Sequence, residues 1–305
     1  MSLLPTRRIR IRPTIILFGD SITEFAFGQQ VDDDRGDGDG STGISTTIGW
    51  SSLLASAYSR RADVLSRGFS GYNTKHAISV MPSIFGNTSD NADHDDGHTR
   101  NENHSPEVPV LFYTVFFGAN DASLPTARQH LPIEEYESNM RQIVNNIRSS
   151  PSNQSTDSNS TSNQQQQQDQ PPIILFTPPP VSAKAWDHYC TVTSPRPLSP
   201  RSNDNCREYG KVVQQIAKDM DCAVVDTFSL LGGDQDDVDV DDEEYYAKYF
   251  VDGLHLNNEG NAIVYRGLME TLKEHHHELL PMVDGDGRYG SSGVPLEEKL
   301  WSELC

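Results

Sequence analysis

The sequence predicts an α/β protein, folded as a three-layer α/β/α sandwich around a central five-stranded parallel sheet. The first observation behind this prediction is that short apolar runs alternate along the chain with segments whose apolar residues recur at helical spacing. The second is that most of these runs are apolar at consecutive positions, as expected for a parallel sheet covered on both faces. Strands that alternate with helices favour βαβ units, and therefore one parallel sheet.

Five apolar runs are the predicted strands. They span residues 14–18, 63–66, 109–117, 172–177 and 223–228. Between them, three segments carry an apolar stripe along one helical face, and each is predicted to be a helix. The stripes run through residues 136–147, 212–220 and 263–272. Two further helices are expected, one from Trp50 to Tyr58 and one after Thr74.

Residues 1–305 are predicted to form a single domain, because the chain shows neither an internal repeat nor a second apolar core. Four low-complexity or acidic insertions interrupt this domain. They lie near residues 31–47, 86–107, 149–171 and 232–244. Since these stretches are poor in aromatic and aliphatic residues, they cannot repay the entropy of ordering and are expected to be flexible.

The acidity of the chain is concentrated in these insertions. The formal net charge is −20, and the four insertions together carry −19 of it. The overall negative charge argues against nucleic acid as a partner. Because the rest of the chain is close to neutral, the acidity says little about the substrate.

Neither a metal nor a cofactor is predicted. None of the acidic runs has the EF-hand pattern, and no glycine-rich phosphate loop is present. Residues 275–277 read His-His-His, but adjacent residues of a helix point in different directions and make a poor metal site. The cysteines show no metal-type pair spacing. They are Cys190, Cys206, Cys222 and Cys305.

No targeting signal or membrane span is expected. The basic residues 1–13 are not followed by the apolar core of a secretion signal before the first strand begins. No apolar run approaches the length that crosses a bilayer. The sequence therefore predicts a cytoplasmic protein, and it leaves the oligomeric state open.

Four short stretches are placed where an α/β protein forms its site. They read FGDSITE (18–24), SRGFSGYNT (66–74), FFGANDA (116–122) and VDGLHLNNEG (251–260). Three of them follow predicted strands directly, and open α/β sheets bind their ligands at the carboxyl ends of the strands. The fourth lies on the loop before the last predicted helix.

Together these stretches resemble the four sequence blocks of the SGNH, or GDSL-type, hydrolase family. The resemblance is closest to the isoamyl acetate-hydrolysing esterase branch, which also matches FTPPPV at residues 176–181. It covers the core and fails only in the insertions. It implies a flavodoxin-like sandwich and a serine esterase that hydrolyses small carboxylic esters of short, acetate-type acyl groups through an acyl-enzyme, without a cofactor.

Three residues are the predicted catalytic triad. A serine hydroxyl needs a base to accept its proton, and the base needs a partner that orients it. The spacing i, i+3 of Asp252 and His255 lets the two side chains converge on one loop. By resemblance, Ser21 is the nucleophile, His255 the general base and Asp252 the group that orients it. An alternative is that the NNEG sequence only caps the next helix, but capping does not explain Asp252 and His255.

The resemblance also implies an oxyanion hole. Its donors are the backbone N–H of Ser21, the backbone N–H of Gly71 and the side-chain amide of Asn120. Gly68 is the rival of Gly71, because glycine at either position would let the backbone approach a substrate closely. The glycine pair common in the wider family reads Gly118-Ala119 here, a departure that matches the esterase branch.

Other interpretations stay open. Ser70, in GFSGY, resembles a nucleophile elbow, but the second glycine of that motif comes one position early. An acyltransferase would use the same acyl-enzyme, and a non-catalytic scaffold could bind partners through the acidic and Gln-rich insertions. Asp20 and Asp121 are expected to be structural hydrogen-bonding groups.

The predicted walls of an apolar substrate pocket are bulky residues near the strand ends. They are Phe25, Leu124, Pro178–Pro180, Trp186 and Leu254. The expected partner is thus a small-molecule ester.

Overall fold

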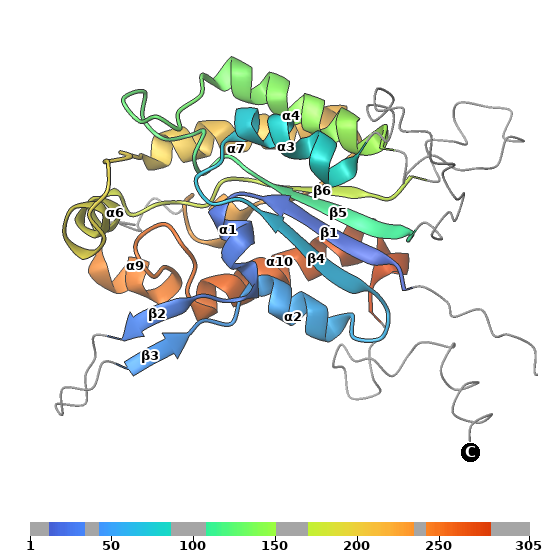
Figure 1. The fold of residues 1–305 in the computed structure, drawn as a ribbon, viewed down its shortest axis with the longest axis horizontal. Coiled ribbons are helices and arrows are strands. Elements are labelled where there is room, and N and C mark those ends of the chain that lie inside the picture. Colours follow the sequence, from blue (N-terminus) through green and yellow to red (C-terminus); the bar gives the residue numbers. More distant parts are fainter. Residues whose placement is uncertain (1–11, 34–42, 87–107, 151–169, 235–241, 282–305) are drawn as a thin grey trace, which may run out of the picture.

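The computed structural model describes residues 12–33, 43–86, 108–150, 170–234 and 242–281 (Figure 1). Its centre is a five-stranded parallel sheet in the order β4-β1-β5-β6-β7. The strands are β1 (Thr14–Gly19), β4 (Asp63–Gly68), β5 (Val110–Phe116), β6 (Ile173–Phe176) and β7 (Ala223–Val225). The predicted parallel five-stranded sheet is confirmed.

Helices cover both faces of the sheet, as the sequence predicts (Figure 1). One face carries α3 (Thr74–Phe85), α4 (Ile133–Arg148) and α7 (Asn203–Asp219), and the other carries α2 (Trp50–Ala57) and α10 (Asn258–His275). The stripe of α4 is fully buried. It consists of Tyr136, Met140, Ile143, Val144 and Ile147. Burial of this stripe fixes α4 against the sheet.

Aromatic side chains fill the core near the ends of the strands. Phe116 of β5 and Phe176 of β6 stack with their ring centroids 4.8 Å apart, and Trp50 of α2 lies 5.7 Å from Phe176. All three side chains are buried. This packing holds the carboxyl ends of the central strands rigidly, so the loops that follow them start from fixed positions.

The chain changes direction across the sheet between β1 and β5. From β1 it passes to β4 on one side, and β5, β6 and β7 then follow on the other side. Such a switch point opens a crevice between the loops that leave the two neighbouring strands. Ser21 follows β1 and Asn120 follows β5, so the two residues lie on either side of this crevice.

Two of the predicted insertions contain regular structure. The stretch 31–47 includes most of an antiparallel ribbon made by β2 (Gln30–Asp33) and β3 (Gly43–Thr46). The acidic stretch 232–244 ends in α9 (Glu243–Tyr249), which Asp242 caps by accepting a bond from the Tyr245 N–H at 3.1 Å. Acidic side chains stabilise the first turn of a helix, so the end of this stretch folds. The insertions 86–107 and 149–171 lie almost wholly outside the described residues.

Several short helices lie in the loops between the main elements. They are α1 (Ser21–Glu24), η1 (Phe25–Phe27), α6 (Ala183–His188), the π-helical turn η4 (Tyr189–Thr193), α8 (Thr227–Leu230) and η5 (His277–Leu279). Figure 1 shows α1, α6 and α9 toward the end of the sheet where the strands finish. The loops at the crevice are therefore structured.

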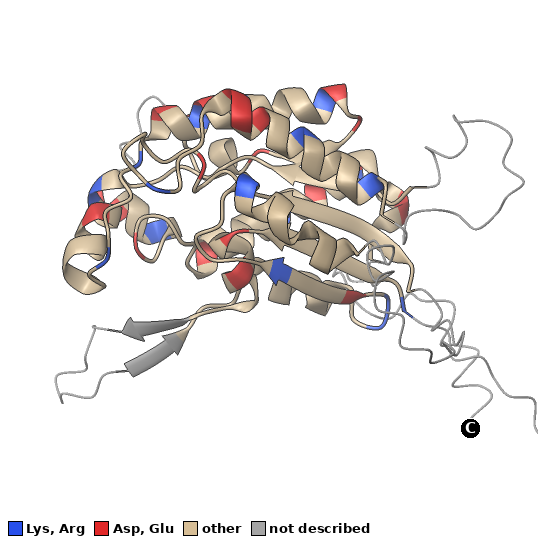
Figure 2. Ribbon diagram, turned by 45° about the horizontal axis from the view of Figure 1, so that its top comes forward, with Lys and Arg blue, Asp and Glu red and all other residues tan. Residues whose placement is uncertain are grey.

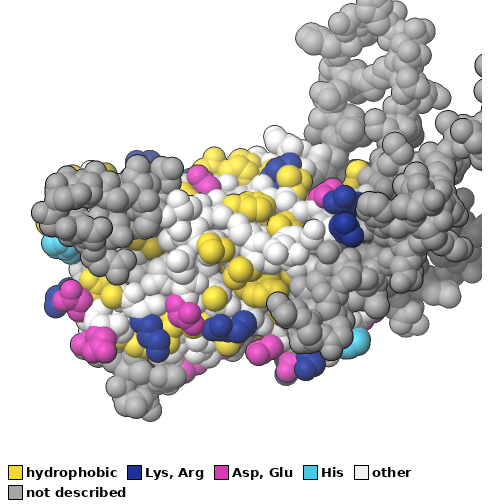
Figure 3. Space-filling view, turned by 90° about the horizontal axis from the view of Figure 1, so that it is seen from below, with side chains coloured by type: hydrophobic (Ala, Val, Ile, Leu, Met, Phe, Trp, Pro, Cys, Tyr) yellow, Lys and Arg dark blue, Asp and Glu magenta, His cyan; other side chains and the backbone are white. Residues whose placement is uncertain are grey.

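The surface of the described chain carries both charge signs. Acidic and basic residues are interspersed along the helices (Figure 2). Seen from the side of α2 and α10, apolar side chains form separate patches, with charged ones mainly toward the edges (Figure 3). Among the helices that the structure describes, none is both long and apolar enough to cross a bilayer.

Candidate active site

Ser21 is held at the start of α1, directly after β1. The preceding residue, Asp20, is the N-cap of this helix, and its Oδ1 accepts a hydrogen bond from the Ile22 N–H at 3.0 Å. The sharp passage from strand to helix leaves Ser21 at the crevice, with only 5% of its surface exposed. The turn residues that end the strand thus also position the serine.

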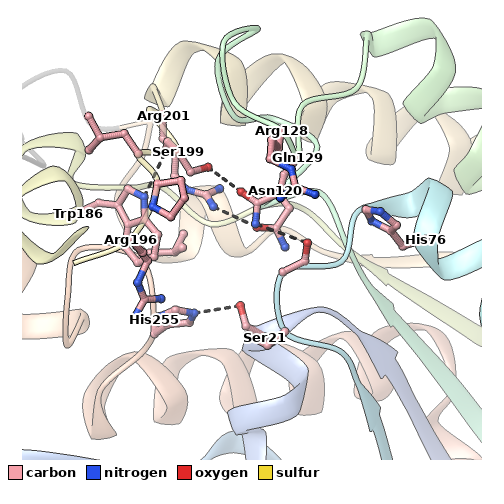
Figure 4. A pocket seen from close by; sticks show the side chains of 15 residues that line it. Ser21, His76, Asn120, Arg128, Gln129, Trp186, Arg196, Ser199, Arg201 and His255 are labelled. Carbon is pink, nitrogen blue, oxygen red and sulfur yellow. Dashed lines mark hydrogen bonds between the residues drawn. The ribbon is translucent and has the colours of Figure 1, made fainter. Parts of the chain in front are cut away.

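The structure brings the three predicted triad residues together. Ser21 Oγ lies 2.9 Å from His255 Nε2, and His255 Nδ1 lies 2.6 Å from Asp252 Oδ2 (Figure 4 shows the first of these bonds). Asp252 Oδ1 accepts the backbone N–H groups of Leu254 and His255 at 2.9 and 2.8 Å. Burial would raise the pKa of Asp252, but the adjacent His255 and these hydrogen bonds bring that pKa below its usual range. The carboxylate therefore stays ionised beside the imidazole.

A tight turn at residues 251–255 creates this arrangement. The Val251 N–H donates to the His255 carbonyl at 2.8 Å, and Gly253 has φ +90°, a conformation that favours glycine. The turn docks on the start of α6, where the Ser182 N–H donates to the Gly253 carbonyl at 2.9 Å. A Cβ on Gly253 would lie 2.8 Å from Ser182 O, so the fit has no room for a side chain.

Two aromatic rings hold the imidazole from its sides. The centroid of the Phe25 ring lies 5.3 Å from that of His255, and the Trp186 ring lies 5.8 Å away, both edge to face. Packing of this kind restricts the side-chain rotamer of His255. The ring thus keeps its two nitrogens aimed at Ser21 and Asp252.

The amide of Asn120 has a defined orientation. Its Oδ1 accepts from Arg201 Nη2 at 3.0 Å, and its Nδ2 donates to the Tyr72 carbonyl at 2.8 Å (Figure 4 shows the contact with Arg201). A guanidinium only donates and a carbonyl only accepts. Both contacts therefore require the amide oxygen to face Arg201 and the amide nitrogen to face Tyr72. Asn120 also lines the cavity in front of Ser21.

Arg201 is a site residue that the sequence did not reveal. It is 5% exposed, donates to the Ala119 carbonyl as well as to Asn120, and lies 5.2 Å above the Trp186 ring. Burial lowers the pKa of this guanidinium. Within the described residues it forms no ion pair with a carboxylate. No local motif marks Arg201, because its partners come from another part of the chain.

The two candidate glycines occupy different environments. Gly71 has φ +78° and lines the cavity, and its N–H donates to no acceptor in the described part of the chain. Gly68 packs against the backbone of α1, where a Cβ would collide with the N–H of Glu24. Gly68 is therefore a packing position, and the geometry favours Gly71 as the backbone donor.

The cavity in front of Ser21 has a volume of about 370 Å³. Two of the predicted wall residues, Trp186 and Leu254, line it. Phe25 lines a second cavity of about 800 Å³, which shares Ser70, Arg196 and His255 with the first. Leu124 and Pro178–Pro180 line neither of these two cavities.

Two buried carboxylates support the loops of the site. Asp121 Oδ1 accepts from the N–H and the hydroxyl of Thr74 at 2.9 and 2.6 Å, which anchors the start of α3. Burial raises the pKa of Asp121 to about 6 and that of Asp20 to about 7. A carboxyl whose pKa is higher in the folded than in the unfolded state contributes its full stabilisation at pH values below its ordinary pKa of 3.8. That stabilisation is lost as the pH rises through about 6 for Asp121 and about 7 for Asp20.

The competing sites are less complete. The backbone N–H of Ser70 donates to the Glu24 carboxylate, and no histidine in the described chain is hydrogen-bonded to its hydroxyl. In the same part of the chain, no three His, Cys, Asp or Glu side chains are grouped so that they could hold a metal ion.

Comparisons with known proteins agree with this geometry. Residues 17–263 match the GDSL-like lipase/acylhydrolase family. The isoamyl acetate-hydrolyzing esterase 1 homolog of Mus musculus is 32% identical over 85% of this chain and 81% of its own length. A GDSL esterase/lipase of Arabidopsis thaliana is 30% identical over 87% of each chain.

Solved structures share the fold. An acetyl-xylooligosaccharide esterase mutant from Geobacillus stearothermophilus aligns with a TM-score of 0.51 at 18% identity, over 90% of this chain and 100% of its own. A carbohydrate acetylesterase family member from Sinorhizobium meliloti gives a TM-score of 0.51 at 18% identity, over 86% of this chain and 98% of its own. The resemblance seen in the four sequence blocks is confirmed. The chain belongs to the GDSL-like lipase/acylhydrolase family.

Proposed function

We propose that this carboxylic ester hydrolase is a serine esterase that acts on small esters with short, acetate-type acyl groups through an acyl-enzyme. The observation that carries the proposal is the continuous relay from Ser21 Oγ to His255 to Asp252, with distances of 2.9 and 2.6 Å. Each member of the relay is buried and held by groups outside it. Such an arrangement lets a serine act as a nucleophile near neutral pH.

In the first step, Ser21 Oγ attacks the ester carbonyl carbon while His255 Nε2 takes the hydroxyl proton. A C–O bond to Ser21 forms, and the carbonyl π electrons move to the oxygen. Asp252 accepts the Nδ1–H bond and stabilises the imidazolium that results. The contacts of Asp252 with the N–H groups of Leu254 and His255 keep its carboxylate in place.

Three donors are proposed to stabilise the oxyanion: the N–H groups of Ser21 and Gly71 and the Nδ2 of Asn120. Donors fixed before the reaction stabilise the charge without reorganising, and this term is often the largest in acyl transfer. Arg201 is proposed to act through Asn120 by holding the amide oxygen away from the oxyanion. It is a positioning residue, since its own hydrogen bonds go to Ala119 and Asn120.

The tetrahedral intermediate then collapses. The bond to the alcohol oxygen breaks, and the His255 imidazolium gives its proton to that oxygen, so the alcohol leaves. Water next attacks the acyl-enzyme, with His255 as its base, and releases the acid and free Ser21.

The size of the substrate is inferred from two observations. The cavity of about 370 Å³ holds a small molecule. Relatives that cover most of the chain are named for hydrolysis of isoamyl acetate. Together these observations support a short acyl chain.

A series of p-nitrophenyl esters from acetate to palmitate tests this proposal. The expected result is the highest kcat/KM for the shortest acyl chains, with Ser21→Ala as the inactive control. Highest activity toward long chains would contradict the proposed acyl specificity. Turnover by the Ser21→Ala variant would contradict the mechanism.

A further inference from the structure

The charged side chains that line the cavity in front of Ser21 are all basic. It is lined by Arg128, Arg196 and Arg201 together with His76 and His255, and no Asp or Glu of the described chain lines it. The neighbouring cavity, by contrast, is lined by Lys184 and Arg196 but also by Glu243 and Asp252. The charged residues that line the first cavity are thus all arginines.

Hydrogen bonds to neighbouring groups hold Arg201 and Arg196, but none of the three arginines pairs with a carboxylate among the described residues. Arg201 is tied to Ala119 and Asn120. Arg128 and Arg196 form no ion pair with a carboxylate among the described residues, and Arg128 makes no hydrogen bond there either. Some other arginines of the described chain pair with acids, whereas Arg148 donates to the Met220 carbonyl. Arg141 pairs with Glu137 and Asp219, and Arg266 pairs with Glu259.

Arg196 is held in place although it has no counter-charge. Its Nε donates to the Ser194 carbonyl at 3.1 Å, and its Nη2 donates to the Ser194 hydroxyl at 2.6 Å and to the Tyr189 hydroxyl at 3.3 Å. The guanidinium also lies 4.9 Å over the Tyr189 ring. A guanidinium fixed in this way has already lost most of its conformational freedom, so binding an anion costs less entropy.

The two arginines line different parts of the cavity (Figure 4). In Figure 4, Arg196 is on the side of His255, whereas Arg128 is on the side of Asn120 and Gln129. Both line the same cavity as Ser21 Oγ. An anionic group in either part of the cavity would therefore lie near a cation while the ester carbonyl faces the serine.

We infer that the preferred substrates are acetate-type esters whose alcohol part carries an anionic group, a carboxylate or a phosphate, which Arg128 and Arg196 bind. The inference rests on the proposed function of the same site. An acetyl group is far smaller than the cavity of about 370 Å³, so the alcohol part must occupy most of it. Guanidinium groups bind carboxylate and phosphate by charge-assisted hydrogen bonds.

The contribution of these arginines is expected in KM. They lie away from the carbonyl, so they hold the substrate equally before and in the transition state, and uniform binding of this kind changes KM rather than kcat. Solvent-accessible ion pairs are weak, so the two contacts together are expected to give about a tenfold preference.

The experiment compares three aryl acetates that differ mainly in charge: 4-acetoxybenzoate, 4-acetoxybenzamide and 4-acetoxyphenyl phosphate. Each is assayed with wild type, Arg128→Gln, Arg196→Gln, the double variant and Ser21→Ala. Arg266→Gln is the matched control, because this exposed arginine on α10 lines neither cavity. Using variants cancels the intrinsic reactivity of each ester, since only ratios between proteins are compared.

The double variant is expected to lower the carboxylate-to-amide ratio of kcat/KM about tenfold, through KM, whereas Arg266→Gln keeps the wild-type ratio. If the double variant loses more kcat/KM on the phosphate than on the carboxylate, the preferred substrates carry a phosphate. If it loses more on the carboxylate, they carry a carboxylate. Equal ratios in wild type and the double variant, with normal hydrolysis of the amide, would overturn this inference alone. Ser21-independent hydrolysis, or none of any ester, would overturn the proposed function with it.

Discussion

Replacing Arg201 by Ala should impair catalysis through Asn120. The guanidinium donates to Asn120 Oδ1 at 3.0 Å and also to the Ala119 carbonyl, and the side chain is 5% exposed. Its removal leaves two acceptors without this donor, each worth about 1–3 kcal/mol when buried and unsatisfied. Loss of a destabilising buried charge offsets part of this cost.

The expected loss of kcat follows from the amide geometry. A flipped amide would present its oxygen to the oxyanion, which is equivalent to losing a donor worth about 10²–10³ in rate. Because Nδ2 keeps its 2.8 Å bond to the Tyr72 carbonyl, the amide should flip only part of the time. We therefore expect kcat to fall by about 10–100-fold, less than a complete donor loss, with little change in KM.

The assay is a double-mutant cycle on p-nitrophenyl acetate with Arg201→Ala, Asn120→Ala and the double variant. If Arg201 acts through Asn120, the double variant should be no slower than Asn120→Ala. Millimolar guanidinium should partly restore Arg201→Ala, because this residue lines the open cavity. Arg207→Ala, which removes an arginine outside the cavity, is the control. Multiplicative losses in the double variant, with no rescue, would refute the reasoning.

Three further predictions concern the neighbours of the triad. Asn120→Asp should lower kcat by about 10²–10³ with little change in KM. Its melting temperature should fall modestly, because the carboxylate can still bind Arg201 but cannot donate to the Tyr72 carbonyl; near-native kcat would exclude Asn120 from the oxyanion hole. Asp20→Asn keeps the cap on Ile22 and stays neutral. As the pH rises from about 4 to about 8, the variant should therefore become increasingly more stable than wild type, by at most about 4 kcal/mol in free energy of unfolding, and its melting temperature should exceed that of wild type accordingly. A constant difference at every pH would contradict this. Gly253→Ala should cost about 1–3 kcal/mol of stability and lower kcat, because φ is +90° and Ser182 O lies 2.8 Å from the new Cβ. Gly210→Ala, which meets only ordinary contacts at 3.5 Å, should cost less than Gly253→Ala in the same melting experiments.

The parallel sheet was predictable because its signal is local. Residues 109–117 are apolar at nearly every position, and β5 forms within them from Val110 to Phe116. The last strand was predicted too long at 223–228, whereas β7 ends at Val225. The reason is Asp226, whose Oδ1 accepts the Ser229 N–H at 3.2 Å and starts α8 instead. A side-chain cap can outweigh β propensity at the end of a strand.

The short helices were not predictable from periodicity. The α6 helix has six residues and α9 has seven, too few for an apolar stripe to repeat over several turns. Yet α6 supplies Trp186 and the contacts that hold the turn at Gly253. Docking against the rest of the fold determines these helices.

Some residues of the site could be predicted from the sequence, and others could not. Ser21, Asp252 and His255 lie in motifs whose chemistry can be read locally, and the structure brings them together. Gly71 and Gly68 could not be distinguished, because only the folded backbone shows which of them faces the cavity. Arg201 could not be found because Asn120 lies 81 residues away in the sequence.

The most direct test of the mechanism is to map where a serine-directed phosphonate attaches to the protein. Labelling of wild type followed by peptide mass spectrometry should give one adduct, on Ser21. His255→Ala should slow labelling strongly, since the base that accepts the hydroxyl proton is gone, and Ser21→Ala should prevent it while the melting temperature stays close to that of wild type. An adduct on Ser70, or labelling that persists in Ser21→Ala, would contradict the proposed nucleophile.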